Sequence, residues 1–305
     1  MNNEKLLTIS IASYNVEKCL AKCLDSLILN NDNFRYLDVV IVNDGSKDNT
    51  LNVAKKYVDM YPDVFRVVDK ENGGYGSTIN SSIAIAKGQY YKLLDADDLF
   101  DTKGLNKLLE HIKWCKPDLI ITPYIKNFVD VNKQVLVKDI DGEIDLKNFE
   151  LQTFSNIPAM HSMCVRTECV KDMHIQEHCF YTDNEYVAYV LLNTNTVSSI
   201  SDSVYIYNLG INDQSMSLNG LRRHLSDWEK VYLGIKKMLE ASTPSNKDNM
   251  ICLMQKEIVY SMYLAHLVQE DFLKYKESII AIDQRIKSED NHIYKITNNI
   301  RIIKY

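Results

Sequence analysis

The sequence predicts an α/β fold in which helices cover a sheet that is largely parallel. Three observations lead to this prediction. Strand-like and helix-like segments alternate along the first hundred residues, which is the pattern of βαβ units. The run Leu37–Val42 is almost continuously apolar, as expected of a parallel strand buried on both faces. A chain of 305 residues is also long enough to bury a core of this kind.

The elements of the first half follow from periodicity and from turn residues. The β-branched run Leu6–Ala12 predicts a first strand, and Ser46 and Asp48 are both suitable N-caps for a helix that follows the second strand. The expected helices are Val16–Leu29, Asn49–Met60 and Ser77–Ala86, the last closed by Gly88, and the other strands are Leu37–Val42, Phe65–Val68 and Tyr90–Leu94.

The second half predicts antiparallel strands as well as helices, so the whole sheet is expected to be mixed. The expected elements are a helix over Gly104–Cys115, a strand over Leu119–Thr122, antiparallel strands within residues 124–147, a helix over Val187–Leu192, a strand over Val204–Tyr207, and helices over Ser226–Ala241 and Met250–Gln269. The character of the chain changes at Leu221, after which dense apolar positions at helical spacing predict a helical extension.

The composition is that of an ordinary soluble globular protein, with 46% hydrophobic and 25% charged residues. The net charge of −6 argues against a nucleic-acid-binding surface. No apolar run reaches the roughly 18 residues that a membrane span needs. Seven cysteines without a Cys-x-x-Cys pair, and the lack of a signal peptide ahead of the first strand, lead us to expect a reducing cytoplasm.

Three carboxylates end the predicted strand Tyr90–Leu94. Asp95, Asp97 and Asp98 lie so close in sequence that their charges repel one another and are costly to bury. A divalent cation would relieve that cost, because Mg2+ and Mn2+ prefer carboxylate oxygens and leave room for phosphate groups. Asp95-Ala-Asp97 is therefore interpreted as the holder of a metal ion that in turn holds a diphosphate. A solvated acidic turn is the alternative for these acids taken alone.

Polar side chains also follow the other predicted strands of the first half. Ser13 and Tyr14 follow the first strand, Asp44 the second, and Lys70 and Asn72 the third. Because the carboxyl ends of parallel strands meet at one edge of a sheet, these side chains and the acidic stretch are expected to share one cleft. This convergence favours the metal interpretation.

Two other nucleotide-binding classes are excluded by their missing motifs. A dinucleotide-binding domain would need Gly-x-Gly-x-x-Gly directly after the first strand, and a P-loop would need Gly-Lys-Ser/Thr. The chain has neither. The cluster Gly73, Gly74 and Gly76 follows the third strand, where either a phosphate cradle or a tight turn would account for it.

In this order and at these spacings, the motifs of the first hundred residues resemble those of family 2 glycosyltransferases of the GT-A fold. They are Ile11-Ala-Ser-Tyr-Asn15, Val42-Asn-Asp-Gly-Ser46 followed by Asp48-Asn-Thr50, Asn72-Gly-Gly, Asn80, Gly88 and Leu94-Asp-Ala-Asp-Asp98. The resemblance implies a Rossmann-like mixed sheet flanked by helices. It also implies a catalytic domain over residues 1–220, with a nucleotide-sugar half (1–100) and an acceptor half (101–220), and a helical extension over residues 221–305.

The resemblance further implies roles for single residues. Tyr14 would pack against the base, Asp44 would read the base edge, Asp95 would contact the ribose or the sugar, and Asp97 would bind Mn2+ or Mg2+. The other residues implied in nucleotide-sugar binding lie in the same loops: Ala12, Ser13, Glu17, Lys70, Asn72, Gly73 and Ala96. Enzymes of this kind invert the anomeric centre. The implied substrates are a UDP-sugar donor and a glycan or lipid-linked glycan acceptor, as in bacterial surface-polysaccharide synthesis.

The chemistry then needs one further group, a base that takes the proton of the acceptor hydroxyl. Asp183 and Glu185 lie beside aromatic residues at the start of a predicted helix, where a plain N-terminal charge is the structural alternative. The family usually shows a Glu-Asp pair here, and this chain has Thr182-Asp183, so the base role is assigned to Asp183 with Glu185 in reserve. His161 is interpreted as structural, with a catalytic role as the lesser alternative.

A basic residue after the last strand would complete the diphosphate site. Similar enzymes carry a Gln-Ser-Met-like loop and a basic clamp, for which Asp213-Gln-Ser-Met-Ser217 and Arg222 are the candidates. Arg223 and His224 share this position, and a charged helix start is the alternative.

The segment Arg285–Tyr305 carries five Lys or Arg against two acids, together with regularly spaced isoleucines. A peripheral helix on the inner face of the plasma membrane and a helix docked on the core both fit this pattern. Packing against a second subunit is a further option for the extension. Two other functions stay open: a sugar-nucleotide pyrophosphorylase, although its Gly-x-Gly-Thr-Arg loop is missing, and a non-catalytic scaffold.

Overall fold

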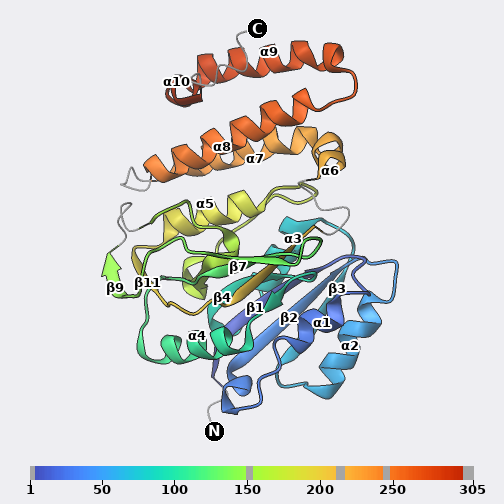
Figure 1. Ribbon diagram of the computed structural model, residues 1–305, viewed down its shortest axis with the longest axis vertical. Helices are drawn as coiled ribbons and strands as arrows, with labels where there is room; N and C mark the ends of the chain where they lie inside the picture. The colour runs from blue at the N-terminus through green and yellow to red at the C-terminus, as the bar shows by residue number, and fades with distance from the viewer. Residues whose placement is uncertain (1–3, 149–153, 211–216, 243–247, 298–305) are drawn as a thin grey trace.

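A computed structural model describes residues 4–148, 154–210, 217–242 and 248–297 (Figure 1). Among these residues, eight strands form the main sheet in the order β3-β2-β1-β4-β10-β6-β11-β9. Their bounds are β1 Lys5–Ser13, β2 Leu37–Asp44, β3 Phe65–Lys70, β4 Gly88–Asp95, β6 Leu119–Ile121, β9 Ile144–Asn148, β10 Met163–Arg166 and β11 Thr196–Ser199. Strands β1 to β4 are parallel, whereas β10 is antiparallel to both neighbours, so the predicted mixed α/β sheet is confirmed.

Helices cover both faces of this sheet because its strands are apolar on both sides. In β4, Tyr90 and Leu94 join the core on one face, and Tyr91 and Leu93 join the core on the other. The first face packs against α1 Leu20–Asp25, α2 Thr50–Met60 and α4 Thr102–Trp114. The second packs against α3 Tyr75–Ile83, α5 Asp183–Asn193 and the C-terminal helices. All eight residues of β2 are buried, as the apolar run predicts.

A second, smaller sheet lies beside the end of β4. It consists of β5 Leu99–Phe100, β12 Tyr205–Leu209, β7 Tyr124–Phe128 and β8 Lys133–Val137 in the order β5-β12-β7-β8. The predicted antiparallel pairing is present in β7 with β8, and β12 adds parallel to β7. This sheet brings β12 next to the acidic stretch that follows β4.

Several predicted helices have different bounds, and the helix expected over Val187–Leu192 begins earlier, at Asp183. The helix expected over Val16–Leu29 is only α1 Leu20–Asp25, because residues before it are held in turns, where the backbone N–H of Val16 donates to Thr50 Oγ1 at 2.8 Å. The helix expected over Ser77–Ala86 begins at Tyr75 and ends at Ile83. Gly88 does not close it but begins β4, where a Cβ atom would lie 2.3 Å from the backbone nitrogen of Thr8.

The C-terminal helices form successive layers on the α5 side of the sheet, farthest from the N-terminus (Figure 1). They are α6 Leu218–Arg223, α7 Leu225–Ala241, α8 Asp248–Leu267, α9 Phe272–Glu289 and α10 Asn291–Thr297. Ile286 and Ile293 are buried in the same apolar cluster as α5 and α8. These two isoleucines are therefore used for docking on the core. The segment's last residues, 298–305, lie outside the described part.

None of the helices within the described residues combines the length and the apolar character that crossing a membrane would require.

Candidate active site

A hollow of about 540 Å³ opens at the carboxyl ends of β1, β2 and β3. The ring of Tyr14 forms part of its wall and is half exposed. The loop after β1 is tied to the loop after β2, because the Asn15 N–H donates to Ser46 Oγ and the Asn15 side chain accepts from the Lys47 N–H. The residues lining the hollow are Tyr14, Gly45, Lys47, Asp69, Lys70, Glu71 and Asn72.

Asp44 lies at the end of β2 and joins this hollow to the glycine-rich loop. Its carboxylate accepts the N–H groups of Gly73 and Gly74 at 2.9 and 2.8 Å and the ammonium of Lys70 at 2.8 Å. Asp44 is only 2% exposed. The tight-turn explanation of the glycines is thus supported at Gly74, whose φ of 81° favours glycine. Among the described residues, Oδ2 of Asp44 accepts only the Gly74 N–H, so this oxygen can accept a further hydrogen bond.

The other residues assigned to the nucleotide side lie in the same loops. Ala12 pairs with Asp95 across β1 and β4, and Ser13 ends β1 with a buried hydroxyl that has no hydrogen-bond partner among the described residues. Glu17 accepts the backbone N–H of Asn49, and Ala96 is buried in the core. The structure therefore brings these residues to one sheet edge, as the topology of parallel strands requires.

The acidic stretch after β4 forms a tight turn, in which the Asp98 N–H donates to the Asp95 carbonyl. Asp98 is buried, and its carboxyl accepts the Tyr205 hydroxyl and the Asn208 N–H, each at 2.7 Å. Asp95 accepts the Tyr75 hydroxyl at 2.8 Å. Burial raises the pKa of Asp95, Asp97 and Asp98, and repulsion between the charges raises it further for Asp95 and Asp98.

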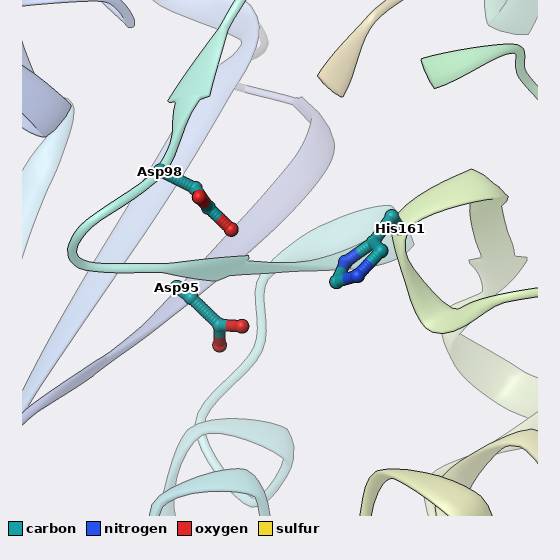
Figure 2. Close-up of side chains that lie close together, drawn as sticks. All are labelled: Asp95, Asp98 and His161. Atoms are coloured by element: carbon teal, nitrogen blue, oxygen red, sulfur yellow. The ribbon is translucent and has the colours of Figure 1, made fainter. Parts of the chain in front are cut away.

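His161 lies near Asp95 and Asp98 and offers a ring nitrogen as a possible third metal ligand beside their carboxylate oxygens (Figure 2). The ligand atoms of Asp95, Asp98 and His161 all lie within 4.8 Å of one another. His161 belongs to the short 3-10 turn Met160–Ser162, and its Nδ1 is buried without a hydrogen-bond partner among the described residues. Burial lowers the pKa of His161 to about 3, so the imidazole is neutral and able to donate a lone pair.

Lys92 fixes the segment that carries His161. Its ammonium, fully buried on β4, donates to the carbonyl oxygens of His161 and Met163 at 2.7 and 3.1 Å. Burial lowers the pKa of Lys92 to about 8.

Asp183 and Glu185 occupy different surroundings at the start of α5. Asp183 lies close enough to Asp95 and Tyr75 for its charge to raise the pKa of both groups, and burial raises the pKa of Asp183 itself. Glu185 is fully buried and accepts the backbone N–H and the side-chain amide of Gln176. Of the two acids, only Asp183 thus lies near the acidic stretch, while Glu185 is held by a neighbouring loop.

Arg222 is placed elsewhere in the described part of the chain. Its guanidinium donates to the Val268 carbonyl at 2.7 Å and to Glu270 at 3.1 Å, beyond the end of α8. The ring of His224 stacks on Phe180 at 3.4 Å between centroids. Residues 211–216, which include most of the Gln-Ser-Met loop, lie outside the described residues, so the proposed closure over a diphosphate stays a prediction.

Four residues around the acidic turn carry no assignment from the sequence: Tyr75, Tyr205, Tyr207 and Asn208. The Asn208 N–H and side-chain amide hold the acidic turn through Asp98 and the Asp97 carbonyl. One signal was available for two of the aromatic residues, since the alternation of the strand Val204–Tyr207 places Tyr205 and Tyr207 on one face.

Comparison with known proteins identifies the family to which these residues belong. A family model described as glycosyl transferase family 2 matches residues 8–180. An uncharacterized glycosyltransferase of Mycoplasma genitalium is 35% identical over 145 residues, 47% of this chain and 47% of that protein. The hyaluronan synthase of Pasteurella multocida is 37% identical over 110 residues, 36% of this chain and 11% of that protein. The chain thus covers less than half the length of these curated relatives.

Two solved structures share the fold at low sequence identity. TarS of S. aureus, residues 1–349 in complex with UDP-GlcNAc, superposes with a TM-score of 0.69 at 17% identity, covering 94% of this chain and 82% of that one. The mannosyltransferase PcManGT of Pyrobaculum calidifontis, in complex with GDP-Man and Mn2+, gives 0.54 at 13% identity, covering 96% and 83%. These likenesses establish a GT-A fold.

Proposed function

Because this chain belongs to glycosyl transferase family 2, we propose that it transfers a sugar from a nucleotide diphosphate to a hydroxyl group of a glycan or lipid-linked glycan, with inversion. The observation that carries this proposal is the order of groups along one sheet edge. The hollow lies over β1 to β3, the acidic turn follows β4, and Asp183 lies beside that turn. A nucleotide, its diphosphate and an acceptor hydroxyl would occupy these three places in the same order.

A uridine donor is the form we propose for the hollow. The half-exposed ring of Tyr14 offers a face for a base, and Asn72 lines the same hollow. The related TarS structure holds UDP-GlcNAc, which supports a UDP-sugar for this chain. The match to family 2 favours transfer over the pyrophosphorylase alternative.

A divalent cation fits the donor set. Asp97 is the ligand expected from the sequence, and Asp95, Asp98 and His161 converge within 4.8 Å beside it. Burial raises the pKa of these carboxyls, and a bound cation would offset the cost of keeping them charged. When bound, Mn2+ or Mg2+ would neutralise the charge that grows on the leaving diphosphate.

Asp183 is the base in this proposal. Its carboxylate would accept the proton of the acceptor hydroxyl while the hydroxyl oxygen bonds to the anomeric carbon and the diphosphate leaves from the opposite face. Burial raises the pKa of Asp183, and a more basic carboxylate is better suited to take that proton. Glu185 is engaged with Gln176 and is not needed for this step.

The first experiment is a thermal-stability assay with nucleoside diphosphates, each with and without Mn2+. A ligand present at about a hundred times its dissociation constant adds about 2.7 kcal/mol to the free energy of unfolding, which is easily measured. We expect UDP to stabilise the protein only with Mn2+, and Asp97→Ala to abolish the effect. If no nucleotide stabilises the protein, the proposed donor site is refuted. If UDP binds but no UDP-sugar is turned over, the scaffold function is supported instead.

The remaining sequence-based predictions are kept as proposals. They are the division at residue 220, a cytoplasmic location, membrane contact through residues 285–305, and a homodimer formed through the C-terminal helices. Gel filtration and vesicle co-sedimentation of the full chain test the last two.

A further inference from the structure

Strand β12 is held against the acidic turn, and it carries an unassigned aromatic side chain, Tyr207, that packs on His161. The backbone N–H of Asn208 donates to Asp98, and its side-chain amide donates to the Asp97 carbonyl, both at 2.7 Å. The neighbouring Tyr205 is fully buried and bonds to Asp98. Tyr207 lies two residues farther on, so it points to the same side of the strand as Tyr205 but is only partly buried.

The ring of Tyr207 rests on the imidazole of His161. Their centroids are 4.3 Å apart with planes at 34°, and His161 is in turn packed against Tyr205 at 4.7 Å and Tyr124 at 5.4 Å. The buried ammonium of Lys92 anchors this turn through the His161 carbonyl. Tyr207 therefore has a rigid support on one side.

The hydroxyl of Tyr207 makes no hydrogen bond with any residue that the structure describes, and four acidic side chains lie near enough to act on it electrostatically. Its pKa is raised by burial and then by the charges of Asp98, Asp95, Asp183 and Asp97. These four carboxylates belong to the acidic turn and to the start of α5, so Tyr207 lies near both. No described residue competes with a ligand for its hydroxyl.

We propose that Tyr207, supported by His161, is the platform on which the sugar ring of the acceptor packs while its hydroxyl faces Asp183. This inference rests on the proposed transferase function. One face of a pyranose ring is a set of C–H groups that packs on an aromatic ring, and the hydroxyls at its edge suit a phenol group as partner. The nucleotide hollow is lined by the loops after β1, β2 and β3 and includes no residue of β12, so we place the acceptor on the β12 side of the acidic turn.

The experiment measures the binding of a sugar ring to the full chain saturated with UDP and Mn2+. The probes are the methyl glycosides of glucose, galactose and N-acetylglucosamine, followed by saturation-transfer NMR. We expect at least one glycoside to receive saturation at its ring C–H protons. In Tyr207→Ile, its dissociation constant should rise about tenfold, since an aromatic contact and its hydroxyl contact are both lost. Isoleucine suits a strand, which keeps β12 intact.

Two further variants make the comparison specific. Tyr207→Phe keeps the ring and should weaken glycoside binding by no more than about threefold. Tyr260→Ile, a matched change at a partly exposed tyrosine of α8, should leave it unchanged. If Tyr207→Ile proves too unstable, nuclear Overhauser contacts between the glycoside ring protons and the Tyr207 ring of the wild type replace it, and their absence refutes the platform.

The outcomes separate the two proposals. Loss of the UDP-dependent stabilisation in the wild type would refute the transferase site itself. If that stabilisation is present but Tyr207→Ile binds the glycoside as tightly as the wild type does, or if the wild type binds none of the three glycosides, the platform is refuted and the donor site stands.

Discussion

Replacing Tyr205 by phenylalanine should destabilise the protein far more than the same change two residues away. Tyr205 is fully buried, and its hydroxyl has two partners in the acidic turn. It accepts the Asp95 N–H at 3.1 Å and donates to the Asp98 carboxyl at 2.7 Å. Phenylalanine keeps the ring contacts with Phe100 and His161, so the change removes the hydrogen bonds alone.

The magnitude follows from what is left behind. The Asp95 N–H and one oxygen of Asp98 would both lose a partner in a part of the protein where Asp98 is 1% exposed, so water is poorly placed to replace it. A buried polar group without a partner costs about 1–3 kcal/mol, which gives a loss of about 3 kcal/mol for the pair. For a chain of 305 residues, that loss lowers the melting temperature by about 5 °C.

The assay is thermal and urea unfolding of the full chain without nucleotide, with Tyr207→Phe as the control. The Tyr207 hydroxyl is partly exposed and unbonded among the described residues, so its removal should change the free energy of unfolding by less than about 0.5 kcal/mol. The reasoning is wrong if Tyr205→Phe lies within that same margin, or if the two variants are equally destabilised.

The other predictions concern the base, the metal and the buried lysine. Asp183→Asn should lower the transfer rate roughly 10²–10⁴-fold while the UDP-dependent shift in melting temperature is retained; full activity would remove Asp183 from the base role. Glu185→Gln should instead act on stability, because Glu185 accepts two hydrogen bonds from Gln176, and a loss of activity with unchanged melting temperature would contradict this. Mn2+ can be titrated while the melting temperature of the UDP complex is followed. Asp97→Ala should abolish the stabilisation by Mn2+, and His161→Ala should lower the apparent affinity for Mn2+ at least tenfold when the imidazole is a ligand. An unchanged titration of His161→Ala would leave His161 as a packing residue only. Burial lowers the pKa of Lys92 to about 8, against 10.5 for the free side chain. Between pH 8 and pH 10.5, Lys92 is therefore protonated to a greater extent in the unfolded chain than in the folded protein. Relative to Lys92→Met, the wild type should therefore gain stability as the pH rises from 8 to 10, by at most about 1.4 kcal/mol per pH unit, and a flat difference in urea midpoints would show that Lys92 titrates normally.

Much of the fold was predictable because apolar runs and turn residues determine the strands and helices locally. The apolar run of β2 is buried along its whole length, and the order of strands and helices predicts the parallel sheet around β1. Helix ends were less predictable. Gly88 looks like a helix stop in sequence, yet it begins β4 because only a residue without Cβ can lie against the backbone of Thr8.

The site residues that follow parallel strands were predictable, because those strands end at one edge of the sheet. Contacts between segments far apart in the sequence were less predictable. Asp44 and Asp95 follow parallel strands, so topology alone brings them to the same edge. Tyr205 lies more than a hundred residues from Asp98, and no periodicity reports a contact at that separation. The sequence position of Arg222 fits a basic residue near the diphosphate. In the structure, its guanidinium donates to the Val268 carbonyl in the segment after α8, and sequence spacing does not report this contact.

The close packing of α7 on α5 limits where this chain can be truncated or recombined with a relative. At Gly234 a Cβ atom would lie 2.4 Å from the carboxylate of Glu185, so a larger side chain there would displace this carboxylate from Gln176. The same apolar cluster continues from α3 through α5 into α10. A chain shortened at residue 220 would leave α5 with an uncovered apolar flank. Exchanging the C-terminal helices between relatives would accordingly disturb α5 and alter catalysis. A working exchange would have to include α5 as well.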